Sequence, residues 1–135
     1  MAATKEEIIA FLETEFPQSK CRVDEVGEGR AIVSHHIGVD ELRPGGTVSG
    51  PVLMGLADVA LYVAIFGTIG IVPLAVTTSL TINFLRKPSA QARIIAHCDL
   101  IKVGRALIVG EISLYSEGSS AVVAHAVGTY AIPPK

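Results

Sequence analysis

Residues 49–66 read SGPVLMGLADVALYVAIF, and Asp58 is the one charged side chain among them. The uncharged surroundings extend much further, because residues 44–85 contain no other Asp, Glu, Lys or Arg. The opening Ser49-Gly50-Pro51 predicts a helix start, since Ser is a good N-cap and Pro is tolerated in the first turn. A helix that is apolar on all sides belongs inside a domain. We therefore expect a buried central helix over residues 51–66.

Asp58 is the residue of this helix that most needs an explanation. A carboxylate in apolar surroundings must find hydrogen-bond partners, hold a proton more tightly or take part in chemistry. Burial is also one way in which proteins make a carboxylate basic enough to activate water near neutral pH. The structural alternative is an acid held by backbone N–H groups or by Thr77. We expect Asp58 to be functional.

Sequence patterns on both sides of the central helix predict an α+β domain. A capping box formed by Thr4 and Glu7 begins a short amphipathic helix within residues 1–17, which Pro17 ends. A β-hairpin is predicted around a glycine-containing turn at residues 27–30. Because no linker or repeat interrupts the chain, we expect residues 1–135 to form one domain with an antiparallel sheet wrapped on the central helix. Four strands of this sheet are expected after the helix, at residues 75–85, 92–103, 106–115 and 120–132.

The strand at residues 75–85 should bring a threonine to the central helix and to Asp58. Strict alternation places Thr77, Ser79 and Thr81 on one face of this strand and Thr78, Leu80 and Ile82 on the other. The pattern does not tell which of the two faces is the inner one.

The bulk composition excludes several classes of protein. Half of the 135 residues are hydrophobic and the formal net charge is −2, which is not the composition of a disordered or nucleic-acid-binding chain.

Two cysteines without a C-x-x-C motif suggest a reduced compartment, and the N-terminus does not have the pattern of a secretory signal. Residues 59–76 pass a length test for a membrane span, but Gly67, Gly70 and Pro73 favour a helix, a turn and a strand. We expect a cytoplasmic protein with some apolar surface buried between subunits.

The histidines do not form a recognisable metal motif. His35, His36, His97 and His125 lie on predicted strands or their ends, at spacings that fit no zinc site. We therefore expect no metal. None of them is close in sequence to Ser49, so we do not expect Ser49 to be an activated nucleophile. Ser49 stays a candidate catalytic residue at the helix start, with a plain N-cap as the alternative.

Three stretches of the chain share a pattern with a known family. They are residues 49–58, residues 76–86 and the turn Val103-Gly104-Arg105. Together with the order of elements, they resemble the PaaI-like hotdog-fold thioesterases of the phenylacetate-degradation type, over roughly residues 30–132. The resemblance implies the hotdog fold, an α+β domain with its sheet around a central helix. It also implies homodimers joined at their sheet edges, or homotetramers.

The same resemblance implies hydrolysis of an acyl-CoA thioester, with CoA as part of the substrate and no further cofactor. By position, Asp58 is the base or nucleophile, the Gly50 N–H polarises the thioester carbonyl, and Thr77 helps to hold the water. The chain departs from the family where Ser49 replaces its His, and where Arg43 stands at a position that is Asn or Gln in some members. The substrate-binding residues expected from position and charge, including cations for the CoA phosphates, are Arg43, Asn83, Arg86, Lys87 and Arg105.

Two other functions stay open on the sequence. A non-catalytic hotdog protein that binds acyl-CoA or another ligand is favoured by the replacements at Ser49 and Arg43. A hotdog dehydratase or hydratase is the third alternative. Such enzymes generally pair an acid with a catalytic His, and no His is near residues 49–58 in the sequence.

Overall fold

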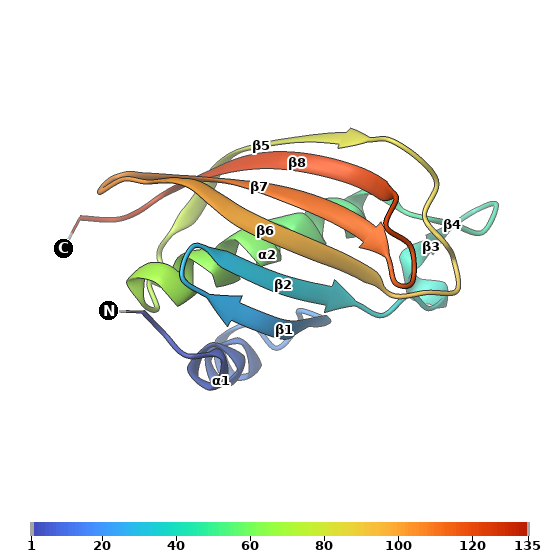
Figure 1. Ribbon diagram of the computed structural model, residues 1–135. Coiled ribbons are helices and arrows are strands. Elements are labelled where there is room, and N and C mark those ends of the chain that lie inside the picture. Colours follow the sequence, from blue (N-terminus) through green and yellow to red (C-terminus); the bar gives the residue numbers. More distant parts are fainter. Residues whose placement is uncertain (1, 135) are drawn as a thin grey trace.

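The computed structural model of the protein describes residues 2–134 (Figure 1). The expected elements are confirmed, including the N-terminal helix with its capping box between Thr4 and Glu7. Only short elements before the central helix, η1, β3 and β4, were not expected. In chain order the elements are α1 (Lys5–Glu15), β1 (Cys21–Gly27), β2 (Arg30–His35), the 3-10 turn η1 (Val39–Glu41), β3 (Leu42–Arg43), β4 (Thr47–Val48), α2 (Gly50–Ile69), β5 (Val76–Phe84), β6 (Ile94–Val103), β7 (Leu107–Ser116) and β8 (Val122–Ala131).

The main sheet is antiparallel and curves around α2 (Figure 1). It has six strands in the order β1-β2-β6-β7-β8-β5, while β3 and β4 form a separate two-stranded hairpin. The strand β5 therefore lies at one edge of the main sheet, beside β8 only. An edge strand presents unpaired N–H and C=O groups along its outer side.

Helix α2 is the core of the domain, as the sequence predicts, and it is longer than the expected 51–66. The Ser49 hydroxyl caps it by accepting the N–H of Val52 at 3.3 Å. The helix is long and apolar enough to cross a membrane by length and composition, but 61% of its most apolar window is buried. The high hydropathy of α2 is therefore that of a core helix enclosed by a curved sheet.

One stripe of α2 is not covered, in contrast to the expectation of a helix buried on all sides. Pro51, Met54 and Gly55 are exposed, and Asp58 and Tyr62 are half-buried. Spacings of three and four residues place all five on the same side of the helix. Asp58 therefore lies on the open face of an otherwise buried helix.

Two glycines allow α2 to approach the sheet closely. Gly110 of β7 and Gly128 of β8 are register neighbours. A Cβ atom at either would lie only 2.6 or 2.7 Å from a methyl carbon of Leu61. A methyl group at either position would push Leu61 away. Glycine at both positions therefore lets α2 pack closely against β7 and β8.

A β-bulge in β5 changes which residues face the helix. The register of β5 against β8 shifts between Thr77 and Ser79, so strict alternation breaks there. Thr77 therefore shares the inner face with Leu80 and Ile82, and the expected grouping of Thr77 with Ser79 and Thr81 is wrong. The extra residue in the bulge is what sequence alternation could not detect.

Candidate functional site

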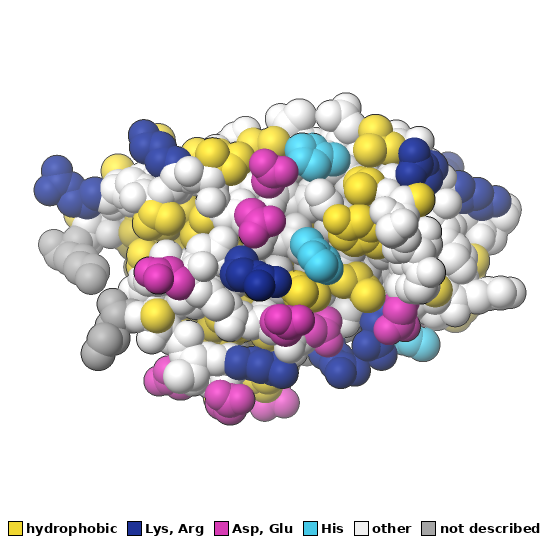
Figure 2. All heavy atoms as spheres, viewed as in Figure 1, with side chains coloured by type: hydrophobic (Ala, Val, Ile, Leu, Met, Phe, Trp, Pro, Cys, Tyr) yellow, Lys and Arg dark blue, Asp and Glu magenta, His cyan; other side chains and the backbone are white. Residues whose placement is uncertain are grey.

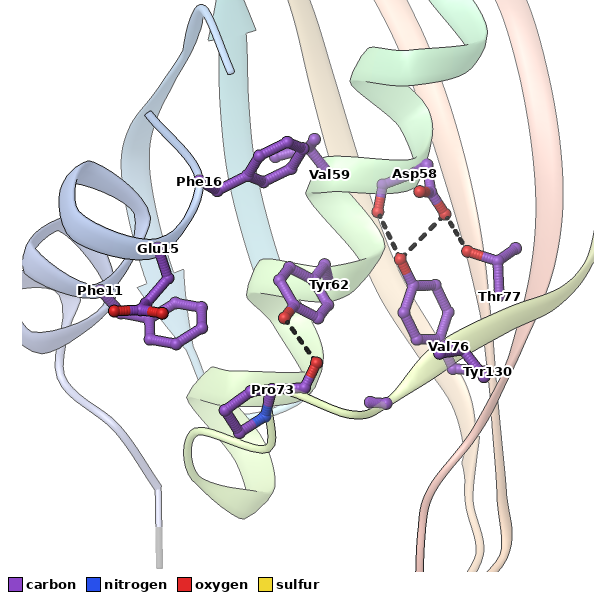
Figure 3. Close-up of a pocket in the computed structure, with 11 residues that line it drawn as sticks. Phe11, Glu15, Phe16, Asp58, Val59, Tyr62, Pro73, Val76, Thr77 and Tyr130 are labelled. Carbon is purple, nitrogen blue, oxygen red and sulfur yellow. Dashed lines mark hydrogen bonds between the residues drawn. The ribbon is translucent and has the colours of Figure 1, made fainter. Parts of the chain in front are cut away.

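Two hydroxyl groups hold the carboxylate of Asp58 through a single oxygen (Figure 3). Thr77 donates from Oγ1 to Asp58 Oδ1 at 2.7 Å, and Tyr130 donates from its hydroxyl to the same oxygen at 2.9 Å. Within residues 2–134, no protein hydrogen bond is formed by the other oxygen, Oδ2. The carboxylate is thus fixed in orientation through Oδ1 alone, which leaves Oδ2 free to accept a hydrogen bond from a ligand or water.

Tyr130 is the member of this group that the sequence reasoning missed. It is the register partner of Thr77 across β5 and β8, and its side chain is almost fully buried. Burial, followed by the nearby charge of Asp58, raises the pKa of Tyr130 above its ordinary value, so the phenol stays protonated and donates. The only signal in the sequence was alternation along β8, which puts Tyr130 on the inner face with Ala124, Ala126 and Gly128.

Two hollows meet at Asp58. The first, about 390 Å³, has four aromatic rings in its lining and is drawn in Figure 3. The second, about 360 Å³, lies between the exposed start of α2 and the start of β1, and His35 is on its wall. Asp58 lines both hollows and is therefore accessible from either side. The rings of the first hollow belong to Phe11, Phe16, Tyr62 and Tyr130.

The N-terminus of α2 carries Gly50, whose N–H is the predicted oxyanion donor. As the first residue of the helix, Gly50 has an N–H with no intrahelical acceptor. The ring of Phe84 packs over this position, because a Cβ atom on Gly50 would lie 3.4 Å from it. Ser49, a candidate catalytic residue on the sequence, serves as the N-cap: its hydroxyl accepts the N–H of Val52 in the first turn.

A buried acid fixes the residue that precedes Gly50. The carbonyl oxygen of Glu41 accepts the N–H of Ser49 at 2.9 Å. Its carboxylate accepts the N–H of Gly38 at 2.8 Å and lies 3.2 Å from His35 Nε2 and 3.3 Å from Lys20 Nζ. The Gly38 N–H is the largest cause that lowers the pKa of Glu41 to about 2. Sequence reasoning missed this network, because its members come from four separate segments.

The two predicted catalytic groups are far apart within one protomer. Gly50 and Asp58 are eight residues apart on one straight helix, which separates them by roughly 12 Å along its axis. A single carbonyl group cannot reach both. One protomer therefore holds each half of the expected machinery but does not bring the halves together.

The remaining predicted residues do not form one cluster in the protomer. Arg43 is exposed on β3, and Arg86 and Lys87 are exposed just after β5. Arg105 is exposed in the turn between β6 and β7, at the opposite end of the sheet (Figure 1). Asn83 lies on the outer face of β5, away from Asp58, because its register partner is His125, whose ring faces the side chain of Glu111. Figure 2 shows histidine side chains on this outer face of the sheet. The part of the chain from residue 2 to residue 134 has no cluster of three His, Cys, Asp or Glu able to hold a metal.

The family profile described as the Thioesterase superfamily matches residues 45–123, more than half of the chain. Among solved structures, the chain is 41% identical to a protein named as a candidate thioesterase from Silicibacter sp. TM1040, with a TM-score of 0.89 and coverage of 97% and 92% of the two chains. It is 27% identical to a mutant of the phenylacetic acid degradation protein PaaI from Thermus thermophilus, with a TM-score of 0.74 and coverage of 92% and 99%. The fold is shared by smu.793 from Streptococcus mutans UA159, solved bound to acetyl CoA, at 20% identity, a TM-score of 0.76 and coverage of 87% and 91%. No curated protein sequence matches the chain.

Glu41 should give the fold a pH-dependent stability. Because its pKa is about 2 in the folded protein and 4.5 ordinarily, its contribution is complete above pH 4.5 and is lost as the pH falls towards 2. We expect Glu41→Gln to lower the free energy of unfolding by on the order of 3 kcal/mol at neutral pH, with the deficit shrinking across that acid range. Urea denaturation at a series of pH values measures it. A deficit that is constant with pH would contradict this assignment, and Glu28→Gln in the exposed β1–β2 turn is the control.

Proposed function

The chain belongs to the Thioesterase superfamily, and from this premise we propose that it hydrolyses an acyl-CoA thioester to the free acid and CoA. The observation that carries the proposal is the Asp58 carboxylate, held by Thr77 and Tyr130 through one oxygen where two hollows meet. The acetyl CoA bound to the Streptococcus mutans protein, which has the same fold, supports CoA thioesters as the substrate class.

Asp58 is the group that delivers the attacking oxygen. In one route, the free Oδ2 takes a proton from water as the water oxygen attacks the thioester carbonyl carbon; the carbon–sulfur bond then breaks, and CoA leaves as the thiol with that proton. In the other route, Oδ2 attacks the carbon itself and CoA leaves as the thiolate; water then hydrolyses the acyl-aspartate anhydride to the free acid and the carboxylate, and a proton from that water ends on CoA. In both routes the hydroxyls of Thr77 and Tyr130 keep the carboxylate in one orientation. Holding a reacting group in place is a large part of what an active site contributes to rate.

The Gly50 N–H is the proposed donor to the thioester oxygen, where negative charge develops as the carbonyl is attacked. The N-terminus of α2 adds its positive end of the helix dipole to the same point. Because Gly50 and Asp58 are roughly 12 Å apart on one helix, the donor must come from a second copy of the chain.

A two-fold dimer meets this requirement. Met54 is midway between Gly50 and Asp58, so two antiparallel α2 helices crossing near Met54 put each Asp58 opposite the Gly50 of the other copy. The uncovered stripe of α2 and the open edge of β5 are the surfaces that such a dimer would bury. We propose a homodimer as the functional unit, which a homotetramer could contain twice, in the cytoplasm.

The same pairing suggests where the CoA phosphates bind. Antiparallel contact between two β5 edges would bring Arg86 and Lys87 of one copy towards the Arg105 end of the other. Cations gathered in this way match the phosphate groups of CoA. Arg43 stays a predicted substrate contact near the start of α2, whereas Asn83 is predicted on the family pattern alone.

A hydratase is less well supported than a hydrolase. His35 does line a hollow shared with Asp58, although it is distant in sequence. However, its two ring nitrogens already face Cys21 and Glu41. With both ring nitrogens engaged in this way, His35 has no nitrogen free to face a hydratase substrate held at Asp58.

Asp58→Asn should remove turnover while leaving the fold intact. The amide keeps the size of the side chain but cannot act as a base or nucleophile, so we expect kcat to fall at least about 10²-fold. Release of CoA from a panel of acyl-CoA thioesters, followed with a thiol-reactive dye, measures it. Asp99→Asn, an equal charge change at an exposed position of β6, should retain activity. Wild-type protein that binds acyl-CoA but releases no CoA would instead support the non-catalytic binding protein.

Gly50→Pro and Gly50→Ala form a matched pair that isolates the backbone donor. Proline is accepted at the first position of a helix, and the extended backbone of Ser49 is compatible with a following proline. We expect Gly50→Pro, which lacks the N–H, to lose about 10² to 10³ in kcat. Gly50→Ala keeps the N–H and needs only a small movement of Phe84, so it should lose far less. Equal losses would show that the N–H is not the donor.

Met54→Glu tests the dimer. Two carboxylates brought together near a two-fold axis repel each other, and each would be taken out of water. We expect this variant to sediment as a monomer. Without the second copy, it should also lose activity. Val39→Glu changes a residue of η1 that is 85% exposed and is not part of the α2 stripe, and it should leave both properties unchanged. An active Met54→Glu monomer would contradict a site shared between copies.

A further inference from the structure

A chain of Cys, His and Glu side chains lies on the wall of the second hollow, apart from the hydroxyls that hold Asp58. Cys21 Sγ is 3.8 Å from Nδ1 of His35, and Nε2 of His35 is 3.2 Å from Oε2 of Glu41. Cys21 and His35 are register partners across β1 and β2, so their side chains share a face. The turn η1 then brings Glu41 to the far side of the imidazole.

The network assigns the tautomer of His35. Glu41 is ionised above pH 4.5, because the Gly38 N–H, His35 and Lys20 lower its pKa to about 2, and an ionised carboxylate can only accept. The His35 nitrogen that faces Glu41 therefore carries the hydrogen. The other nitrogen, Nδ1, presents its lone pair to the sulfur of Cys21. This is the arrangement of nucleophile, base and orienting acid that activates a side chain for attack.

The thiol is reachable and keeps its proton at rest. Cys21 is half-buried and lines the second hollow together with Asp58. Burial raises the pKa of the Cys21 thiol, so a reaction at the sulfur requires a base to receive the proton. His35 is the group placed to do so. Cys98 has no such setting, since it is only 1% exposed and burial raises its pKa to about 12.

We propose that Cys21 is a second nucleophile of this protein, activated by His35 and Glu41, and that it accepts acyl groups from thioesters entering the hollow it shares with Asp58. The thiol proton passes to Nδ1 of His35 as the sulfur attacks the thioester carbonyl carbon and a new carbon–sulfur bond forms. The original carbon–sulfur bond then breaks. The leaving thiolate takes the proton back from the imidazolium, which gives S-acyl Cys21 and a free thiol.

The thiol chemistry is tested first without any thioester. Iodoacetamide alkylation of the native protein, resolved by cysteine in a mass spectrometer, should label Cys21 and spare Cys98. We expect His35→Gln to slow the labelling of Cys21 at least about tenfold, and Glu41→Gln to slow it less. Equal rates in wild type and His35→Gln would overturn the proposal. Labelling of Cys98 in a variant reports unfolding, and the decision then rests on the wild-type pH profile.

The pH profile needs no substitution. The other charged groups around the pair are Lys20, Asp40, Glu41 and Asp58. If His35 receives the proton, the labelling rate should rise at a pH below the range in which an isolated thiol ionises. A rate that rises only in the alkaline range of a thiol would overturn the proposal.

Acyl transfer is measured separately, because this part also rests on acyl thioesters being substrates. Asp58→Asn protein is incubated with acetyl-CoA, benzoyl-CoA and octanoyl-CoA, and its intact mass is recorded. We expect the addition of one acyl group on Cys21 with at least one of the three, and none in Asp58→Asn combined with Cys21→Ser. No addition with all three would overturn the transfer step. Retained hydrolysis by Asp58→Asn would instead refute the role of Asp58, so the two failures are distinguishable.

Discussion

The contact of Leu61 with the glycine pair in β7 and β8 fixes the depth at which α2 lies in the sheet. Gly110 and Gly128 offer no Cβ atom, and the helix therefore sits closer to these strands than any other pair of residues would allow. One turn earlier, Asp58 comes within reach of hydroxyls on β5 and β8. A helix held further from the sheet would leave Thr77 and Tyr130 without an acceptor and the carboxylate without an orientation.

The bulge in β5 completes this geometry. An unbroken β5 would alternate so that Thr77 and Leu80 face opposite sides of the sheet. The extra residue lets both face inward, so that the same strand supplies a polar contact to Asp58 and an apolar contact to the core. The chain thus keeps Leu80 and Ile82 packed against the core and changes the face of one residue where the carboxylate needs a donor.

Much of the fold was predictable because its signals are local. The capping box at Thr4, the Ser49-Gly50-Pro51 start and the glycine-containing turns each act over a few residues, and their elements were confirmed. Asp58 could be identified because a charge within an apolar run is visible in the sequence itself. Tyr130 and Glu41 were missed because their roles depend on distant partners, Asp58 in one case and the start of α2 in the other. The bulge at Thr77 was missed for the related reason that register is a property of two strands.

The position of Asp58 on the exposed stripe of α2 explains how an apolar helix can hold an accessible carboxylate. A carboxylate sealed in the core could be stabilised by hydrogen bonds, but neither a substrate nor a second protomer could reach it. On the stripe, Asp58 is held from one side by the sheet and is open on the other. Because the Glu41 carbonyl holds Ser49 at the start of the same helix, both ends of the stripe are fixed before any partner arrives. A second copy would then find the Gly50 end and the Asp58 end of the stripe already in position. The free-energy cost of completing the site would be that of association alone, with no further ordering of these two groups.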